Sequence, residues 1–261
     1  MKATITLVAL LALAASAPLP LQAEEATDSH AAAAAANNPL ANMTSFQLQN
    51  YYVPELYGLP DETSNTAWLR FVKPFGKVLV RASLPLSTVP TSITESTSGV
   101  GDFSVFAAYL MTDPSSPKQY GVGPLVAAPT ATDEVLGADA WQLGAAGVYF
   151  DLSSPTVQWG GLVTWQTDVS GTDSVNTAIA QPLLFFQMGK GAYLRSSGAW
   201  VFDLENDSYY IPVGIGIGKV VKSGRSVFNI FFEPQFTILH DGQGYPAFQV
   251  LAGINLQLLS K

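Results

Sequence analysis

The sequence predicts an all-β protein, a transmembrane antiparallel up-and-down β-barrel of about twelve strands that follows a cleaved signal peptide. Three observations predict it. Long runs of residues alternate between apolar and polar side chains, the pattern of a strand with two unlike faces. These runs hold about ten to thirteen residues, enough for a tilted strand to cross a bilayer. Charged residues make up only 12% of the chain, yet after residue 23 no run of about eighteen apolar residues could form a spanning helix.

The N-terminus is typical of an exported protein. Lys2 supplies a positive charge, Ile5–Ala15 an apolar region and Leu21-Gln22-Ala23 a cleavage site, so residues 1–23 predict a signal peptide. Residues 24–42 predict a periplasmic tail or linker, in which the run of six alanines fits either a short helix or flexible chain. The barrel is expected to occupy residues 43–261. Because the chain has no cysteine, we expect neither disulfides nor thiol chemistry.

The barrel strands follow in order along the rest of the chain. The predicted strands are 43–53, 66–74, 77–86, 100–112, 118–128, 140–150, 157–168, 177–188, 192–202, 208–218, 226–239 and 246–258. The alternation is clearest in the last two, where one face is continuously apolar and the other carries amides, a carboxylate and small residues. Soluble sandwiches alternate in the same way but over strands of about five or six residues, so the length of these strands favours a barrel in lipid.

The predicted connections alternate between tight turns and mostly longer loops. The longer ones are Pro54–Asn65, Ser87–Gly99, Pro129–Asp139, Val169–Asn176, Asp203–Asp207 and His240–Tyr245, and they hold many acidic residues but no Lys or Arg. Most of the basic residues lie in or beside the tight turns. In bacterial outer-membrane barrels the short turns face the periplasm. The even number of strands therefore predicts that both termini are periplasmic and that the acidic loops face outward.

Tryptophans near the strand ends predict an aromatic girdle at the two membrane interfaces. Trp68, Trp141, Trp165 and Trp200 lie close to the predicted outer ends of their strands, and Trp159 lies near an inner end.

Several short motifs resemble a known family. They are Leu48-Gln-Asn-Tyr-Tyr-Val-Pro54, Gly99-Val-Gly-Asp-Phe103, Tyr120-Gly-Val-Gly-Pro124, Trp141-Gln-Leu-Gly144, Gln181-Pro182 and Tyr209-Tyr-Ile-Pro-Val-Gly214. Over about residues 38–258 the chain resembles the outer-membrane proteins associated with the meta-cleavage pathway of phenol degradation, some of which carry the label neuromedin U. The resemblance implies a barrel that moves hydrophobic or aromatic compounds across the outer membrane. Such barrels commonly end on an aromatic residue, whose place Leu258 takes here.

Charged residues within the predicted strands are expected to face the lumen, because an Arg or Lys that faces lipid near the midplane costs about 2–4 kcal/mol. They are Arg70, Arg81, Asp102, Arg195 and Glu233. Arg70 and Arg81 lie nearly opposite each other across a tight turn, and such like charges need water, a carboxylate or a bound anion nearby. Glu233 could reach them from a distant strand. The alternative is a structural ion network that fills a closed lumen.

The alternation also points apolar side chains into the lumen. Phe106, Leu110, Phe150 and Phe185 are expected to form an apolar collar, and most of them fall towards the periplasmic end. The collar could be a hydrophobic constriction or binding patch for an aromatic solute. It could equally be packing for an N-terminal segment that acts as a plug.

The function expected from these features is an outer-membrane channel or facilitator for small, hydrophobic or aromatic solutes in a Gram-negative bacterium. The alternative is a structural or surface-interaction barrel with a filled lumen. No enzyme is expected, although His240 and Asp241 leave a hydrolase at the outer rim as a third, least favoured option. No cofactor or metal is expected. The expected partners are outer-membrane lipid and lipopolysaccharide, the barrel-assembly machinery and a small solute; the net charge of −8 argues against nucleic acid.

Overall fold

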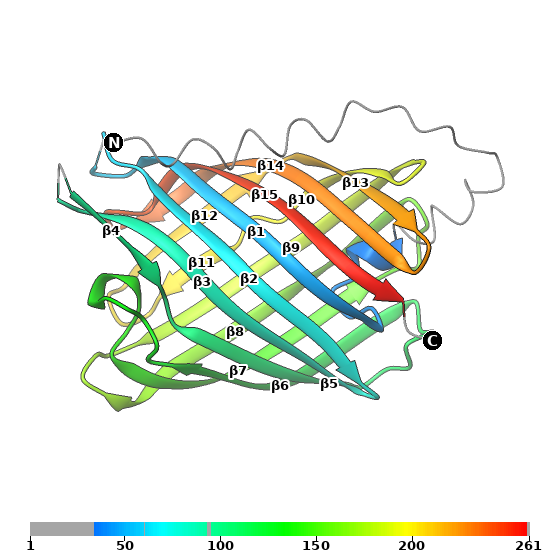
Figure 1. Ribbon diagram of the computed structural model, residues 1–261, viewed down its shortest axis with the longest axis horizontal. Helices are drawn as coiled ribbons and strands as arrows, with labels where there is room; N and C mark the ends of the chain where they lie inside the picture. The colour runs from blue at the N-terminus through cyan, green and yellow to red at the C-terminus, as the bar shows by residue number, and fades with distance from the viewer. Residues whose placement is uncertain (1–33, 60, 93–94, 260–261) are drawn as a thin grey trace.

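The computed structural model describes residues 34–59, 61–92 and 95–259, and within them the strands form one antiparallel sheet that closes into a barrel (Figure 1). The strands are β1 (Met43–Leu56), β2 (Ser64–Phe75), β3 (Val78–Ser92), β4 (Glu95–Val100), β5 (Phe103–Leu110), β6 (Lys118–Ala128), β7 (Ala140–Asp151), β8 (Val157–Gly171), β9 (Asn176–Gly189), β10 (Ala192–Ser196), β11 (Trp200–Asp203), β12 (Ser208–Gly214), β13 (Gly216–Ser223), β14 (Ser226–Asp241) and β15 (Pro246–Leu259). The barrel closes because β15 pairs with both β14 and β1.

Three of the barrel strands are interrupted. The pairs β10/β11 and β12/β13 each continue a single predicted strand across a short break, and β4 and β5 both pair with β3 in succession, although most of β4 was predicted as loop. Counted in this way, the described residues form a barrel of twelve antiparallel strands, and the predicted fold is confirmed. The predicted signal peptide, residues 1–23, lies outside the described residues.

Several strand boundaries differ from the prediction; β13, for example, runs to Ser223, beyond the predicted end at residue 218. Most of the predicted loop Ser87–Gly99 is a strand extension, in which β3 pairs with β4 as far as Ser92 and Glu95. Paired hydroxyls such as Thr88 and Ser98, 2.8 Å apart, stabilise this extension. The sequence did not indicate a strand here, because the composition of the segment is typical of a loop. The first strand runs on to Leu56 because the ladder to β15 absorbs a register shift after Tyr52.

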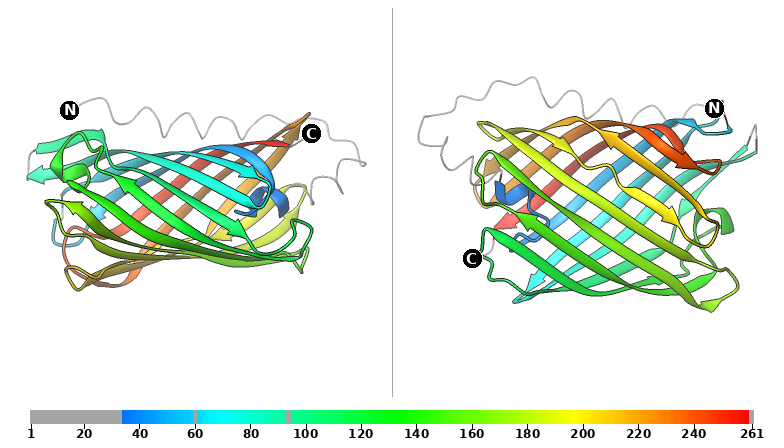
Figure 2. Two further views of the ribbon diagram at one scale, coloured as in Figure 1. Left: turned by 90° about the horizontal axis from the view of Figure 1, so that it is seen from below. Right: turned by 180° about the vertical axis from the view of Figure 1, so that it is seen from behind.

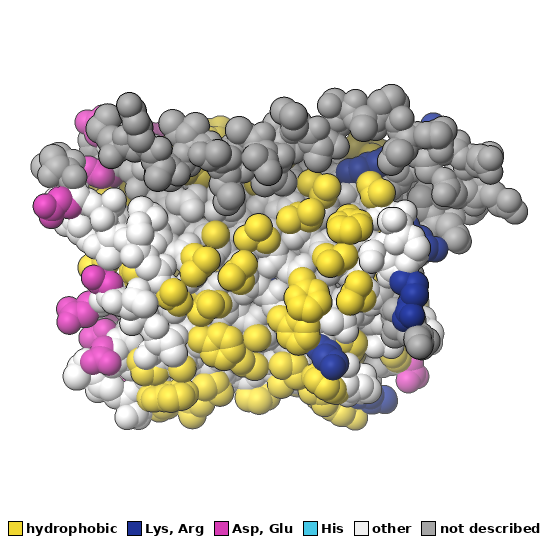
Figure 3. Space-filling view, viewed as in Figure 1, with side chains coloured by type: hydrophobic (Ala, Val, Ile, Leu, Met, Phe, Trp, Pro, Cys, Tyr) yellow, Lys and Arg dark blue, Asp and Glu magenta, His cyan; other side chains and the backbone are white. Residues whose placement is uncertain are grey.

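The two ends of the barrel differ in their connections. The short-turn end carries tight turns, such as the one at Gly76, where φ is 61°. The long-loop end carries the longer connections, which include the 3-10 helix η2 (Glu134–Leu136). Figure 3 shows acidic side chains gathered at the long-loop end and most basic ones at the short-turn end. The structure therefore sorts the two signs of charge to opposite ends, with strands β1 and β15 beginning and ending at the basic one.

Between the two ends the outer wall is apolar (Figure 3). Large side chains such as Ile215, Ile217 and Phe236 are 60–73% exposed there. Apolar patches of this extent are rare on soluble monomers and are typical of a surface covered by lipid or a partner. Within the described residues, no helix is long and apolar enough to cross a bilayer.

The tryptophans divide between the two faces of the wall. Trp141, Trp159 and Trp165 are 44–51% exposed on the outside, as a girdle requires. Trp200 is half-buried, and its indole N–H has no hydrogen-bond partner among the described residues. The assignment of Trp68 to the girdle is wrong, because its side chain lines the lumen. It lies two residues from Arg70 on the same strand, and residues at that spacing share a face.

Candidate functional site: the barrel lumen

The mouth of the barrel at the short-turn end is occupied by residues 34–42, which we call the plug (Figure 2). Residues 34–37 form a helical turn that ends before Asn38 and Pro39. Ala36 and Leu40 are only 5% and 3% exposed. The part of the predicted tail that the structure describes therefore lies inside the barrel.

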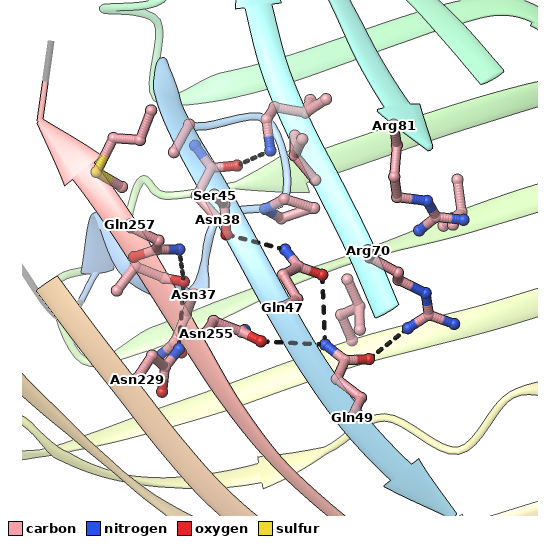
Figure 4. Close-up of a pocket in the computed structure, with 18 of the residues that line it drawn as sticks. Asn37, Asn38, Ser45, Gln47, Gln49, Arg70, Arg81, Asn229, Asn255 and Gln257 are labelled. Atoms are coloured by element: carbon pink, nitrogen blue, oxygen red, sulfur yellow. Dashed lines mark hydrogen bonds between the residues drawn. The ribbon is translucent and has the colours of Figure 1, made fainter. Parts of the chain in front are cut away.

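Hydrogen bonds from three strands hold the plug in place, and Figure 4 shows those from Asn229 and Gln257. The Asn229 side chain on β14 donates to the Ala36 carbonyl at 3.3 Å and to the Asn37 side-chain oxygen at 3.0 Å. On β15, Gln257 also donates to the Ala36 carbonyl, at 2.9 Å. The Asn38 amide donates to Gln119 on β6 at 2.9 Å. The wall amides thus satisfy backbone and side-chain groups of the plug that are shielded from water.

The apolar collar packs around the plug. Phe106 and Leu110 belong to one buried cluster with Leu40 of the plug. Phe150 and Phe185 belong to a second cluster, with Ala36 of the plug. The structure thus shows packing against the N-terminal segment, one of the two roles left open by the sequence.

Two cavities lie along the lumen. One, of about 130 Å³, adjoins the plug, and the other, of about 600 Å³, opens towards the long-loop end. The residues that line both are Arg70, Arg81, Leu162 and Gln181. We call this level, where the two cavities meet, the waist.

The waist lies between two unlike walls. Strands β1, β14 and β15 present mainly amides, with Phe231 and Leu251 as apolar members; the amides are Gln47, Gln49, Gln235, Gln249, Asn255 and Gln257. The opposite wall, from β2 to β9, presents Val72, Leu79, Phe106, Leu125, Val148, Leu162, Leu183 and Phe185, with Gln181 at the waist and Gln142, Thr164 and Gln166 along the larger cavity. Arg70 on β2 and Arg81 on β3 lie where the polar wall meets the apolar one. Beside the smaller cavity a molecule would therefore meet mainly amides on one side and mainly hydrocarbon on the other.

The two waist arginines have little local compensation (Figure 4). Arg70 donates from Nη1 to the Gln49 side-chain oxygen, and its guanidinium lies 4.8 Å from the ring centre of Trp68. The Arg81 guanidinium lies 4.4 Å from the ring centre of Phe106. Both Nε atoms are buried without a hydrogen-bond partner, and within the described residues neither arginine forms an ion pair.

Glu233 does not neutralise these arginines, contrary to the possibility raised by the sequence. Its fully buried carboxylate accepts from Arg195 Nε at 2.7 Å and from the Ser197 backbone N–H and hydroxyl, each at 2.7 Å. Gln235 donates to it at 2.9 Å. Arg195 and Glu233 lie close because β10 and β14 both pair with β13, a relationship that separation along the chain conceals.

Asp102 is also separate from the arginines. It lies in the break between β4 and β5, and its carboxylate accepts backbone N–H bonds from Thr130, Ala131 and Ala138 at 2.8–3.1 Å. It therefore holds the connection from β6 to β7 against the barrel rim. The five charged residues thus form three groups in space: the waist pair, the Arg195–Glu233 pair and Asp102.

Among the described residues of the long-loop end, the side chains of His240 and Asp241 are not joined to a nucleophile by any hydrogen bond. His240 stacks on Tyr57 with ring centres 3.5 Å apart and 14° between the planes. The acidic loops do not converge on a metal site either, because the structure, as far as it describes the chain, has no cluster of three or more His, Asp or Glu side chains that could bind a metal ion.

The sequence raised an N-terminal plug as one of two roles for the collar, but it did not indicate which wall residues hold the plug, and it did not indicate the waist. Asn37-Asn38-Pro39 read as a helix stop, and nothing in those residues indicated that asparagines would reach wall amides. The sequence could have placed Trp68 in the lumen, because it lies two residues from Arg70 on a predicted strand and residues at that spacing point to the same face. The meeting of the two cavities depends on barrel curvature, for which the sequence contains no comparable signal.

Comparison with known proteins finds solved structures with a similar fold. No protein-family model matches this sequence, and no curated protein sequence matches it. Among solved structures, the COG4313 outer membrane channel from Pseudomonas putida F1 is similar, with a TM-score of 0.63 and 12% identity over 85% of this chain and 98% of that chain. The KdgM porin in complex with disordered oligogalacturonate gives a TM-score of 0.51 and 7% identity over 83% of this chain and 99% of that one. At these identities the likeness shows the shared barrel fold.

Proposed function

We propose that this protein is a channel for small solutes in the outer membrane of a Gram-negative bacterium. The observation that carries the proposal is the waist: two cavities meet inside a barrel at a level lined by two arginines, a leucine and a glutamine. The exposed apolar outer wall supports insertion in a bilayer. The two similar structures are an outer membrane channel and a porin, which agrees with this role.

The orientation we propose follows from the connections. The basic short-turn end, with the plug, faces the periplasm, and the acidic long-loop end faces the outside, as in other bacterial barrels. In this orientation a solute enters the larger cavity first and meets the plug last. The outward acidic loops would contact the cations that bridge lipopolysaccharide.

Small hydrophobic or aromatic molecules fit the lumen best. The apolar wall of the waist offers Phe106, Leu162 and Val148 to a ring or short hydrocarbon. The plug, which occupies the mouth at the short-turn end, leaves less room for large solutes. The link to phenol degradation remains a prediction from the sequence motifs.

A barrel with a filled lumen is the second candidate, and the plug is the observation that favours it. Four hydrogen bonds and two apolar clusters hold residues 36–40 in the mouth. A permanently closed barrel would keep these contacts at all times. A channel requires the plug to leave the mouth or to leave a path beside it.

Uptake by porin-deficient cells separates the two candidates. Cells that express the protein should take up labelled catechol faster than cells that carry an empty vector, while uptake of a trisaccharide should stay the same. Heat-modifiable mobility on gels shows in the same samples that the barrel is folded in the membrane. If folded protein leaves the uptake of every small solute unchanged, the channel proposal is wrong and the filled barrel is favoured.

A further inference from the structure

We propose that the waist is a binding site for a small monocarboxylate with an aromatic body, held at its carboxylate by Arg70 and Arg81. The inference deepens the proposed channel function, because it gives the passing solute a negative charge at one end. It follows from three features of the waist: unpaired positive charge, guanidinium edges that remain open, and an apolar wall beside them.

The positive charge is the first feature. Arg70 pairs in register with Ser83, and Arg81 with Val72, so the arginines are diagonal neighbours on one face of two adjacent strands. Diagonal neighbours lie about 7–8 Å apart at their Cα atoms, within reach of long side chains. Both project into the lumen, with no carboxylate partner among the residues that the structure describes. Two shielded like charges without a counter-ion are costly, and an anion between them would offset that cost.

The third lumen arginine provides an internal contrast. Arg195 donates to Glu233 at 2.7 Å and to the Ser197 hydroxyl at 2.6 Å, and its side chain is only 8% exposed. The fold therefore supplies a carboxylate where a lumen arginine has a structural role. It supplies none at the waist, although Arg70 and Arg81 lie beside the larger cavity. At the waist, an anionic ligand would supply the negative charge that Glu233 supplies to Arg195.

The orientation of the guanidiniums limits what that ligand can be. The Arg81 guanidinium lies over the Phe106 ring and that of Arg70 over the Trp68 ring, so an aromatic ring adjoins each. The Nε atoms are buried, so the Nη groups are the donors left for a ligand, apart from the one that Arg70 donates to Gln49. Planar donors at guanidinium edges match the two oxygens of a carboxylate.

The apolar wall determines the rest of the ligand. Leu162 belongs to the waist itself, and Phe106 and Val148 line the adjoining cavity. A bare inorganic anion would leave this hydrocarbon in contact with water. A ring attached to the carboxylate would cover it and gain about 25 cal/mol for each Å² of apolar surface buried. An aromatic monocarboxylate therefore matches both sides of the waist, whereas phenols match only the apolar side.

Binding of benzoate to the folded mature protein in detergent tests the proposal by isothermal titration calorimetry. Benzyl alcohol, which has the ring without the charge, and acetate, which has the charge without the ring, should each bind at least tenfold more weakly than benzoate. Arg81→Gln should raise the benzoate dissociation constant at least tenfold, and Arg70→Gln serves as a second variant. Lys77→Gln removes a positive charge from an exposed turn and should leave binding unchanged.

Each contrary result overturns a defined part of the inference. If benzyl alcohol binds as tightly as benzoate, the charge does not contribute to binding. If acetate binds as tightly as benzoate, the ring does not contribute. Absence of benzoate binding, or binding that survives Arg70→Gln together with Arg81→Gln in protein of normal gel mobility, removes the site. Because the titration needs no transport, benzoate binding in a barrel that moves no solute would end the channel proposal and leave the site standing.

Discussion

The carboxylate of Glu233 accepts a hydrogen bond from the backbone N–H of Ser197 at 2.7 Å. At this point in the barrel wall the regular backbone pairing between neighbouring strands is interrupted. Between β10 and β11, residues 197–199 leave the regular pairing, and the partner strand breaks at Ile215. Ser197 is fully buried, so its N–H would otherwise lack a partner. A side chain from inside the barrel thus bridges a gap in its wall, and Arg195 balances its charge.

Glu233→Ala should destabilise the folded barrel by about 3–5 kcal/mol, because it leaves Arg195 buried without its counter-ion. The midpoint of unfolding in urea, measured in lipid vesicles, provides the test. The double variant Arg195→Met with Glu233→Leu removes both charges at similar volume. It leaves the Ser197 N–H and hydroxyl and the Gln235 amide without their acceptor, as Glu233→Ala does, but it leaves no unpaired charge, so it should be more stable than Glu233→Ala. A double variant less stable than Glu233→Ala would contradict this assignment.

Gly218→Ala should also destabilise the barrel, by about 1–3 kcal/mol, through overpacking. A Cβ at Gly218 would lie 2.1 Å from Cζ of Tyr193, which is fully buried and donates to Asn229 at 2.5 Å. The ring cannot shift without disturbing Asn229, which also holds the plug. Gly147→Ala is the matched control, because its added Cβ would meet only a Val122 methyl at 3.9 Å. Equal melting temperatures for the two variants would show that the interior is looser than described.

The proposed orientation predicts a labelling pattern. Glu134→Cys and Glu205→Cys lie at the exposed long-loop end, and Lys77→Cys and Ser115→Cys at the exposed short-turn end. The chain has no cysteine of its own, so each variant carries a single reactive thiol. An impermeant maleimide should label the first pair in intact cells and the second pair only after lysis. The reverse pattern would invert the topology.

The sequence predicts the strands and their faces well, because a period of two is a local signal. Asn229, Glu233 and Gln235 are buried in the lumen as their alternation required, while Phe232 and Phe236 lie outside. A strand that faces lipid on one side and a packed lumen on the other leaves little freedom of register. The number of strands follows from the same pattern.

The contents of the lumen are harder to predict, because they depend on contacts between residues far apart in the chain. Asn229 and Asn37 are separated by 192 positions, and no local pattern joins them. The partner of Glu233 depended on which strands become neighbours across β13. The breaks near Gly198 and Ile215 leave only weak traces, since small residues in a strand also suit close packing. Trp68 was different, because its spacing of two residues from Arg70 already predicts that both side chains face the lumen.

Single-channel conductance in planar bilayers tests the central claim, that the plug closes a lumen otherwise able to conduct. The full mature chain is compared with a chain that begins at Asn42 and so lacks most of the plug. The shortened barrel should give steady conductance several times that of the full chain, because the mouth lined by Gln119, Asn229 and Gln257 is then open. Removal of the plug that leaves a folded, heat-modifiable barrel with no more conductance than the full chain would contradict the account.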